Sequence, residues 1–408
     1  MLPETEQKTV TTDERVRLTL EGMGPDGSTY ATLEGERVSV FGGIPGEVVV
    51  AAVHRFKHRK RWQAAVSVVE VIEPSPHRVP TPCPYYGPCS GCDWQHIAYS
   101  HQLLLKREQV AQALAARPEL AGVAVAETLP SPQEFGYRNH GRFTVKQSGQ
   151  LGYVNRVTRR WVRVDECMLM HPWINEALTK LQGCCSETTQ LSIRYGINTG
   201  EWLVQPRLAN KDIPLLTGQT HYREQLLDKL FRIASPSFFQ VNTAQAEQLA
   251  SLVLERIAAD GSQTVVDAYA GVGTFSALVA PHVGRVIAIE ESTAAVKDAA
   301  VNTLGIENVE FLLGKTEDVL GTFAKAPDAV ILDPPRTGCH PAAIEAAVRL
   351  APARVVYVSC DPETAARDLT LLVRGGYNVE WVEPVDMFPQ THHVECLSTL
   401  RLVRAVGG

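Results

Sequence analysis

Long hydrophobic runs are absent from this 408-residue sequence. A membrane-spanning helix needs about 20 predominantly apolar residues in a row, and no uncharged apolar stretch approaches that length. The first 20 residues, MLPETEQKTVTTDERVRLTL, also lack the apolar core of a secretory signal peptide. We therefore expect a cytoplasmic protein that has no membrane partner.

An excess of positive charge is absent as well, because 45 Asp and Glu residues outnumber 39 Lys and Arg residues and give a net charge of -6. A nucleic-acid ligand would therefore need a local basic patch. The segment HRFKHRKRW at residues 54–62 is such a patch, with basic residues from Arg55 to Arg61 beside Trp62. It predicts a contact with phosphate groups, although a solvated surface strand or loop would have the same composition.

A disulfide framework is the third absence. The chain has nine cysteines, an odd number, and we expect it to remain in the reducing cytosol. Such cysteines are thiols, metal ligands or a nucleophile more often than disulfide partners.

The length and a hydrophobic content of 45% favour two or three domains. Short β-rich runs separated by Gly-rich turns predict a small OB-like barrel over residues 8–72. A Pro-rich segment opens a central β-rich module over 73–237, within which residues 99–117 have helical spacing and end before a proline. We expect this helix to pack on the domain that follows.

From residue 238 to 408, short apolar strands alternate with helical segments. This pattern predicts an α/β domain of the Rossmann-like type, with a parallel, doubly wound sheet. The last apolar run, VECLSTLRLVR at 394–404, predicts an antiparallel strand at the edge of that sheet.

A glycine-containing loop follows the first of these strands, in VVDAYAGVGTFS at 265–276. Gly271 and Gly273 allow a ligand to approach the backbone closely, and Glu290 ends the next strand, where it can accept hydrogen bonds from ribose hydroxyls. A dinucleotide site would have a third glycine near Ser276. The acid before the glycines, Asp267, is typical of S-adenosylmethionine sites instead. A tight turn without a ligand is the simpler alternative.

Two later strands end in chemically distinctive residues. One of these strands is followed by Asp333 and a rigid Pro-Pro pair, in VILDPPRTG at 330–338. The other is followed by Cys360, in VSCDPET at 358–364. The carboxyl ends of parallel strands meet at one edge of a sheet, so both loops should overhang the same site. An isolated cysteine at a strand end is more often a small buried hydrophobe than a nucleophile.

Five motifs in register change that balance: FFQVN, DAYAGVGTFS, DPPRTG, VSCDPET and FPQTHHVECLSTL. In their order and spacing the sequence resembles the S-adenosylmethionine-dependent RNA uracil-5-methyltransferases, which form 5-methyluridine. The resemblance covers nearly the whole chain. It implies a class I methyltransferase domain over 238–408 and an RNA-binding TRAM domain over 8–72.

The resemblance also implies a covalent mechanism, because uracil C5 is a poor carbon nucleophile. Cys360 is assigned as the nucleophile that adds to C6, and Glu395 as the base that removes the C5 proton. Phe238 is a candidate for stacking on a flipped uracil. Lys315 stands where relatives more often offer an acid or amide to the adenine. The residues assigned to S-adenosylmethionine are Gln240, Tyr269, Gly271, Gly273, Thr274, Glu290 and Asp333.

Three cysteines cluster with the spacing C-x5-C-x2-C, at Cys83, Cys89 and Cys92, and Cys167 stands far downstream. Four thiolates suit either zinc or an iron-sulfur cluster. Structural zinc sites usually pair their ligands, so three ligands together and one distant favour the cluster. The spacing also resembles the iron-sulfur site of bacterial members of the family, which implies a structural 4Fe-4S cluster.

Four further cysteines have no assigned role: Cys184, Cys185, Cys339 and Cys396.

The combination of a TRAM domain with an iron-sulfur cluster favours 23S rRNA as the substrate of a monomeric enzyme, with tRNA as the alternative. An RNA-binding iron-sulfur protein with an inactive methyltransferase domain is a third possibility, and the intact Cys360 and Glu395 argue against it. Arg336 stands where cytosine-5 enzymes carry a cysteine and adenine-N6 enzymes an aromatic residue. No hydride-transfer constellation favours an oxidoreductase.

Overall fold

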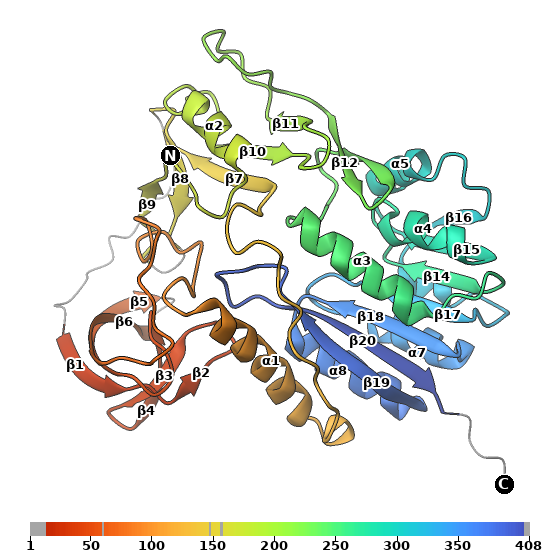
Figure 1. The fold of residues 1–408 in the computed structure, drawn as a ribbon, viewed down its shortest axis with the longest axis horizontal. Helices are drawn as coiled ribbons and strands as arrows, with labels where there is room; N and C mark the ends of the chain where they lie inside the picture. The colour runs from red at the N-terminus through yellow and green to blue at the C-terminus, as the bar shows by residue number, and fades with distance from the viewer. Residues whose placement is uncertain (1–13, 59–60, 147, 156–157, 404–408) are drawn as a thin grey trace. The chain divides into compact units, whose positions relative to one another are not determined.

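The computed structural model describes residues 14–58, 61–146, 148–155 and 158–403 (Figure 1). The chain divides into two compact units. One holds the N-terminal residues through Leu105, with Tyr153–Val162 and Gln390–His392, and the other holds the rest. Over the described ranges, no helix combines the length and the apolar character that crossing a membrane requires.

The first unit contains a six-stranded sheet in the order β1-β5-β6-β4-β3-β2. Its alternating apolar residues, among them Leu18, Val40 and Val53, form one buried cluster. The strands are β1 (Glu14–Thr19), β2 (Gly22–Met23), β3 (Thr29–Leu33), β4 (Glu36–Phe41), β5 (Val48–His58) and β6 (Arg61–Glu73). The basic segment 54–62 lies at the β5–β6 hairpin, and the side chains of 55–62 are outside the described part of the chain.

Helix α1 (Tyr99–Ala115) occupies the predicted position and ends two residues before the predicted boundary. The short helix η1 (Pro118–Leu120) follows it. The middle of the chain is β-rich, as predicted, and also contains α2 (Pro172–Leu181). Its strands are β7 (His140–Val145), β8 (Leu151–Val154), β9 (Trp161–Arg163), β10 (Gln190–Tyr195), β11 (Trp202–Gln205), β12 (His221–Leu226) and β13 (Lys229–Ala234).

A seven-stranded sheet forms the centre of the second unit, in the order β16-β15-β14-β17-β18-β20-β19. The first five strands in that order pair in parallel, which confirms the α/β prediction. The strands are β14 (Thr264–Ala268), β15 (Arg285–Glu290), β16 (Val309–Leu313), β17 (Ala329–Leu332), β18 (Arg354–Ser359), β19 (Tyr377–Val385) and β20 (Glu395–Leu402).

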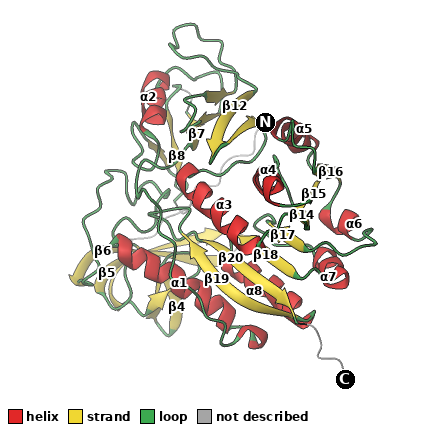
Figure 2. Ribbon diagram, turned by 45° about the vertical axis from the view of Figure 1, so that its right-hand side comes forward, coloured by secondary structure: helices red, strands yellow, loops and turns green. Residues whose placement is uncertain are grey.

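Helices cover both faces of this sheet (Figure 2). Alternate strand residues divide between two cores: Val330 faces the cluster of α1, α7 and α8, and its neighbour Ile331 faces the cluster of α3 and α4. The helices are α3 (Thr243–Ile257), α4 (Thr274–Val279), η2 (Ala280–His282), α5 (Thr293–Asn302), α6 (Thr316–Leu320), α7 (Pro341–Leu350) and α8 (Pro362–Arg374).

The prediction of an antiparallel strand at the C-terminus was right in direction and wrong in position. Strand β20 pairs antiparallel with β18 on one side and with β19 on the other, so it is not an edge strand. The edge belongs to β19, which sequence analysis did not identify. Its proline at position 384 and its β-bulge between Val379 and Trp381 suit an edge, where a missing ladder hydrogen bond is tolerated.

Candidate active site

The candidate site lies where the strands of the seven-stranded sheet end. Ala268 of β14 pairs with Leu332 of β17, so the residues that follow them, Tyr269 and Asp333, leave the sheet side by side. Strand β20 runs in the opposite direction and therefore begins at this same edge. The sheet thus brings together residues that are more than 120 positions apart in the sequence.

Cys360 and Glu395 are brought together by strand register. Ser359 at the end of β18 pairs with Cys396 of β20. Cys360 is one residue beyond this pair on the first strand, and Glu395 is one residue before it on the second. The pairing of two strands thereby places a thiol and a carboxyl group next to each other at the carboxyl end of the parallel sheet.

Both residues open onto a cavity of about 1020 Å³ within the second unit. All but one of the residues predicted for catalysis or cofactor binding line it. The lining residues are Gln240, Tyr269, Gly271, Thr274, Glu290, Asp333, Cys360 and Glu395. Gly273 is the exception: it is the N-cap of α4 with φ of +79°, and a Cβ there would lie 3.2 Å from that of Ala299. Its role is to allow close helix packing.

The glycine loop is held open by Glu290. One carboxylate oxygen accepts the Gly271 amide at 2.8 Å and the other accepts the Ser292 amide at 2.7 Å. Tyr269 has φ of +67° and Gly271 φ of +57°, so the backbone turns sharply straight after β14. The loop therefore presents its backbone to the cavity and keeps Glu290 at its rim.

Ser276, which stands where a dinucleotide site would have glycine, has a defined partner. Its hydroxyl donates to the fully buried Asp267 carboxylate at 2.5 Å. Burial raises the pKa of Asp267 to about 6, against the effect of this hydrogen bond. The acid before the glycines thus anchors the first turn of α4.

The Asp-Pro-Pro loop is fastened by α8. Asp368 accepts the Cys339 amide at 2.7 Å, and the Arg367 guanidinium donates to the Thr337 carbonyl at 3.0 Å. Sequence analysis missed Arg367, which also lines the cavity, because a helix-interior arginine has no local signal of function. Pro362, two residues after Cys360, is the first residue of α8, where the fixed φ of a proline suits a helix start.

Three acidic groups share this edge. Burial raises the pKa of Glu395 to about 8, with Asp333 adding to the shift. Burial and the neighbouring Asp267 raise the pKa of Asp333 to about 7. Burial, followed by Glu395 and Asp333, raises the pKa of the Cys360 thiol to about 12. Without a bound cation, the site therefore holds a neutral thiol next to a carboxyl group that titrates near neutral pH.

The predicted metal ligands form no metal site in the described part of the chain. Within those ranges, no group of three or more Cys, His, Asp and Glu side chains is arranged to hold a metal ion. The structure therefore does not support the iron-sulfur cluster. The prediction depended on sequence spacing, and spacing alone does not determine where the sulfur atoms point.

The raised pKa of Glu395 predicts how stability changes with pH. Between about pH 4.5 and 8, the unfolded chain has released the Glu395 proton and the folded chain keeps it. The free energy of unfolding should therefore fall as pH rises through this window, with a limiting slope of about 1.4 kcal/mol per pH unit from this group. Glu395→Gln removes the group, so its stability relative to the wild type should increase from pH 5 to pH 8 in urea unfolding.

The control for this experiment is Glu291→Gln, which changes an exposed carboxylate at the rim of the same cavity. It should leave the pH profile of the wild type unchanged. Parallel pH profiles for the wild type and Glu395→Gln would contradict the assignment of a raised pKa to Glu395.

Comparison with known proteins identifies the family. An RNA methyltransferase of Gloeobacter violaceus is 35% identical to this chain, and the match covers 94% of this chain and 95% of the relative. An RNA methyltransferase of Halalkalibacterium halodurans is 30% identical, and the match covers 97% of this chain and 99% of the relative. The crystal structure of a Pyrococcus abyssi tRNA (uracil-54, C5)-methyltransferase with S-adenosyl-L-homocysteine has a TM-score of 0.74 at 27% identity, and the match covers 94% of this chain and all of that one. The sequence model of the tRNA (uracil-5-)-methyltransferases matches residues 319–402. This chain therefore belongs to the family of S-adenosylmethionine-dependent RNA uracil-5-methyltransferases.

Proposed function

We propose that this enzyme methylates C5 of a uridine in RNA through a covalent adduct of Cys360, with Glu395 as the base. The observation that carries the proposal is the register of β18 and β20, which puts the thiol and the carboxyl group at adjacent positions in one cavity. A nucleophile for C6 and a base for the C5 proton need that proximity, because C5 and C6 are bonded neighbours in the uracil ring.

The bonds balance in two stages. The Cys360 sulfur bonds to C6, and the electron pair displaced to C5 forms the new bond to the methyl carbon. The bond from that carbon to the sulfonium sulfur would break at the same time, with S-adenosylhomocysteine as the leaving group. Glu395 then takes the C5 proton, the double bond between C5 and C6 reforms, and the bond between carbon and sulfur breaks to regenerate the thiolate. A base whose pKa lies near neutral pH suits this proton transfer.

The Cys360 thiol must lose its proton before it adds to C6. The N-terminus of α8, two residues further along the chain, carries a partial positive charge that favours a thiolate. S-adenosylmethionine supplies the methyl group on a sulfonium cation when it is bound. Positive charge in this cavity favours the ionised forms of Cys360, Asp333 and Glu395, which burial and neighbouring acids otherwise disfavour.

The cavity residues fit a nucleoside-containing cofactor. The carboxamide oxygen of Gln240 is buried and has no hydrogen-bond partner in the described part of the protein, so it is available to a donor on a ligand. Glu290 lies at the rim, where its oxygens keep lone pairs for ribose hydroxyls. Tyr269, Gly271, Thr274 and Asp333 would line the rest of this site.

RNA binding is proposed for two regions. Phe238 is 72% exposed although it lines the cavity, so its ring is available to stack on an unpaired base. The six-stranded sheet of residues 14–73 is proposed as the TRAM-like part, with the basic segment 54–62 on its β5–β6 hairpin contacting phosphates.

Two RNA classes compete as substrate. The sequence layout favours 23S rRNA, and the similarity to an archaeal tRNA (uracil-54, C5)-methyltransferase favours tRNA. Both contain unpaired uridines that could enter the cavity, so the chemistry of the site does not distinguish them. The trapping experiment below does, because it captures the RNA together with the enzyme.

The covalent mechanism predicts a trapped adduct. Fluorine in place of the C5 hydrogen blocks the step assigned to Glu395, so total RNA substituted with 5-fluorouridine should remain linked to the enzyme in the presence of S-adenosylmethionine. Denaturing gels and intact mass should show an RNA-linked protein for the wild type and none for Cys360→Ala. Sequencing the linked RNA identifies the substrate class and the uridine.

The matched control is Cys339→Ala, which removes a buried cysteine of the same cavity. It should still form the adduct. Folded wild-type protein that forms no adduct would favour a cytosine or adenine target, or an RNA-binding protein without methyltransferase activity.

Phe238→Ala should weaken the productive binding of RNA. Loss of a base-stacking ring removes about 1–3 kcal/mol, which corresponds to a decrease in kcat/KM of about fivefold to 150-fold. Affinity for S-adenosylhomocysteine should be retained. Phe238→Trp keeps an aromatic surface and should restore most of the activity, and equal kcat/KM values for Phe238→Ala and the wild type would contradict a stacking role.

The iron-sulfur cluster remains a prediction with a direct measurement. Protein purified without oxygen should contain about four iron and four sulfide per chain if Cys83, Cys89, Cys92 and Cys167 bind a 4Fe-4S cluster. Cys167→Ser should lower both contents, and Cys184→Ser should not. Zinc in place of iron would establish the alternative raised by the sequence.

A further inference from the structure

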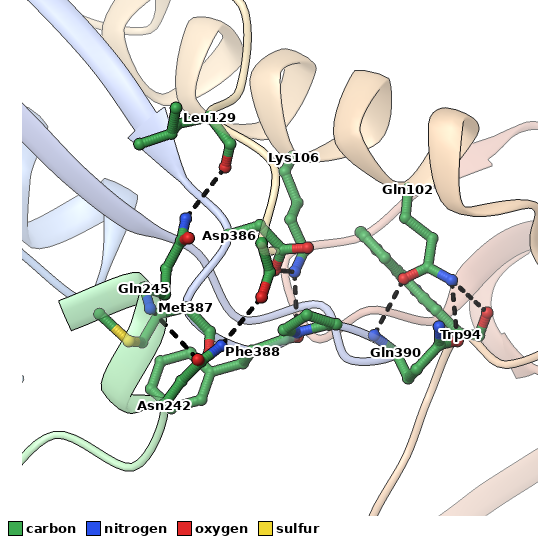
Figure 3. A network of polar contacts seen from close by, with 12 residues as sticks. Trp94, Gln102, Lys106, Leu129, Asn242, Gln245, Asp386, Met387, Phe388 and Gln390 are labelled. Atoms are coloured by element: carbon green, nitrogen blue, oxygen red, sulfur yellow. Dashed lines mark hydrogen bonds and ion pairs between the residues drawn. The ribbon is translucent and has the colours of Figure 1, made fainter. Parts of the chain in front are cut away.

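A fully buried ion pair lies at the segment that joins β19 to β20 (Figure 3). The Lys106 ammonium of α1 donates to the Asp386 carboxylate at 2.5 Å, and both side chains have no exposed surface. The same ammonium donates to the carbonyl of Phe388 at 3.1 Å. Lys106 therefore binds two points of the segment Asp386–Pro389, one of them on the backbone.

Such a pair is a poor source of stability. Removing two charges from water costs several kcal/mol per ion, and their mutual attraction offsets that cost only in part. A pair of apolar side chains of similar volume often gives equal or greater stability. A buried ion pair does, however, fix the positions of the two groups that it joins. The contacts around the pair therefore show which part of the chain it holds in place.

The pair is one of several anchors on the same short segment. Asn242 donates to the carbonyl of Met387 at 3.3 Å, and the Tyr137 hydroxyl donates to the carbonyl of Pro389 at 3.0 Å. The Asp386 amide donates to the carbonyl of Leu129 at 3.0 Å. Groups from separate parts of the chain thus fix one loop through its backbone.

This segment begins next to Glu395 in space. Val385, the last residue of β19, pairs with Glu395, the first residue of β20. Asp386 is therefore the first residue of the loop that joins these two strands, and Glu395 directly follows the end of this loop. On its other side, β20 pairs with β18 at the position before Cys360. Any shift of the loop base moves Glu395 relative to the thiol.

We propose that Lys106 and Asp386 are positioning residues that hold Glu395 where it can remove the C5 proton. The inference rests on the proposed function, and it concerns only the second half of the reaction. Cys360 lies between β18 and α8, outside the segment Asp386–Pro389 to which Lys106 donates. Loss of the pair should therefore slow release of the methylated RNA and leave adduct formation and methyl transfer largely intact.

The test uses a variant that removes both charges together, Lys106→Met with Asp386→Ala. A single substitution would leave one buried charge without compensation and would destabilise the protein. With ordinary uridine in the RNA, the double variant should accumulate a methylated, RNA-linked enzyme. Release of product should slow by about tenfold or more, whereas methyl transfer in a single turnover should change less than about threefold.

Two control variants are compared with the double variant. Glu395→Gln, which lacks the base, should accumulate the same adduct. Arg374→Gln with Glu119→Gln removes an ion pair of the same unit that joins α8 to η1 away from this loop, and it should turn over like the wild type. A purely structural role of the Lys106 pair would lower the melting temperature without trapping methylated RNA.

The outcomes separate the two proposals. If Glu395→Gln traps RNA and the folded double variant does not, the positioning role is wrong and the proposed function stands. If neither Glu395→Gln nor 5-fluorouridine RNA gives an adduct, the proposed function fails, and the positioning role fails with it.

Tyr137→Phe serves if the double variant does not fold, because it removes only the hydroxyl that holds the Pro389 carbonyl. It should slow product release by about threefold to tenfold, in line with the loss of one hydrogen bond. Unchanged release in a folded Tyr137→Phe variant, together with trapping by Glu395→Gln, would overturn the inference.

Discussion

The antiparallel pairing of β20 with β18 is the constraint on which the candidate site depends. Parallel strands deliver their carboxyl ends to one edge of a sheet, and an antiparallel neighbour delivers its first residue to that same edge. The ladder from Arg354–Arg401 to Ser359–Cys396 therefore fixes Glu395 next to Cys360 without any direct hydrogen bond between their side chains. A shift of one residue in this register would turn Glu395 to the opposite face of the sheet.

The same geometry concentrates buried acidic groups around one cavity. Burial raises the pKa of Asp333, of Glu395 and of the Cys360 thiol, and neighbouring acids add to each shift: Asp267 for Asp333, Asp333 for Glu395, and both Glu395 and Asp333 for Cys360. The pocket is therefore better suited to a cation than to an anion or a neutral ligand. A sulfonium cofactor carries such a positive charge, and the raised pKa of Glu395 lies close to neutral pH.

The loop Asp386–Pro389 links the N-terminus of α3 to the end of β19. Asn242, which caps α3 and follows the predicted cofactor residue Gln240 by two positions, binds the loop backbone. Asp386 continues directly from the strand that pairs with Glu395. Asn242 and the strand that pairs with Glu395 are therefore joined by one short segment, and the buried Lys106 ammonium donates to two points of it, the Asp386 carboxylate and the Phe388 carbonyl.

The sequence by itself determined the local features of this protein. Strand-to-loop motifs identified Cys360, Glu395 and the glycine loop, and apolar alternation after residue 238 identified the α/β domain, because these signals depend on neighbouring residues only. The tertiary structure decided what depends on distant pairs. It placed β20 inside the sheet by pairing it with β19, gave Ser276 a partner in Asp267 and assigned Gly273 to helix packing. It also brought Lys106 to Asp386, 280 positions away. No local pattern encodes that contact, since a lysine in an amphipathic helix is ordinarily exposed to solvent and only the packing of α1 against the segment between β19 and β20 buries it.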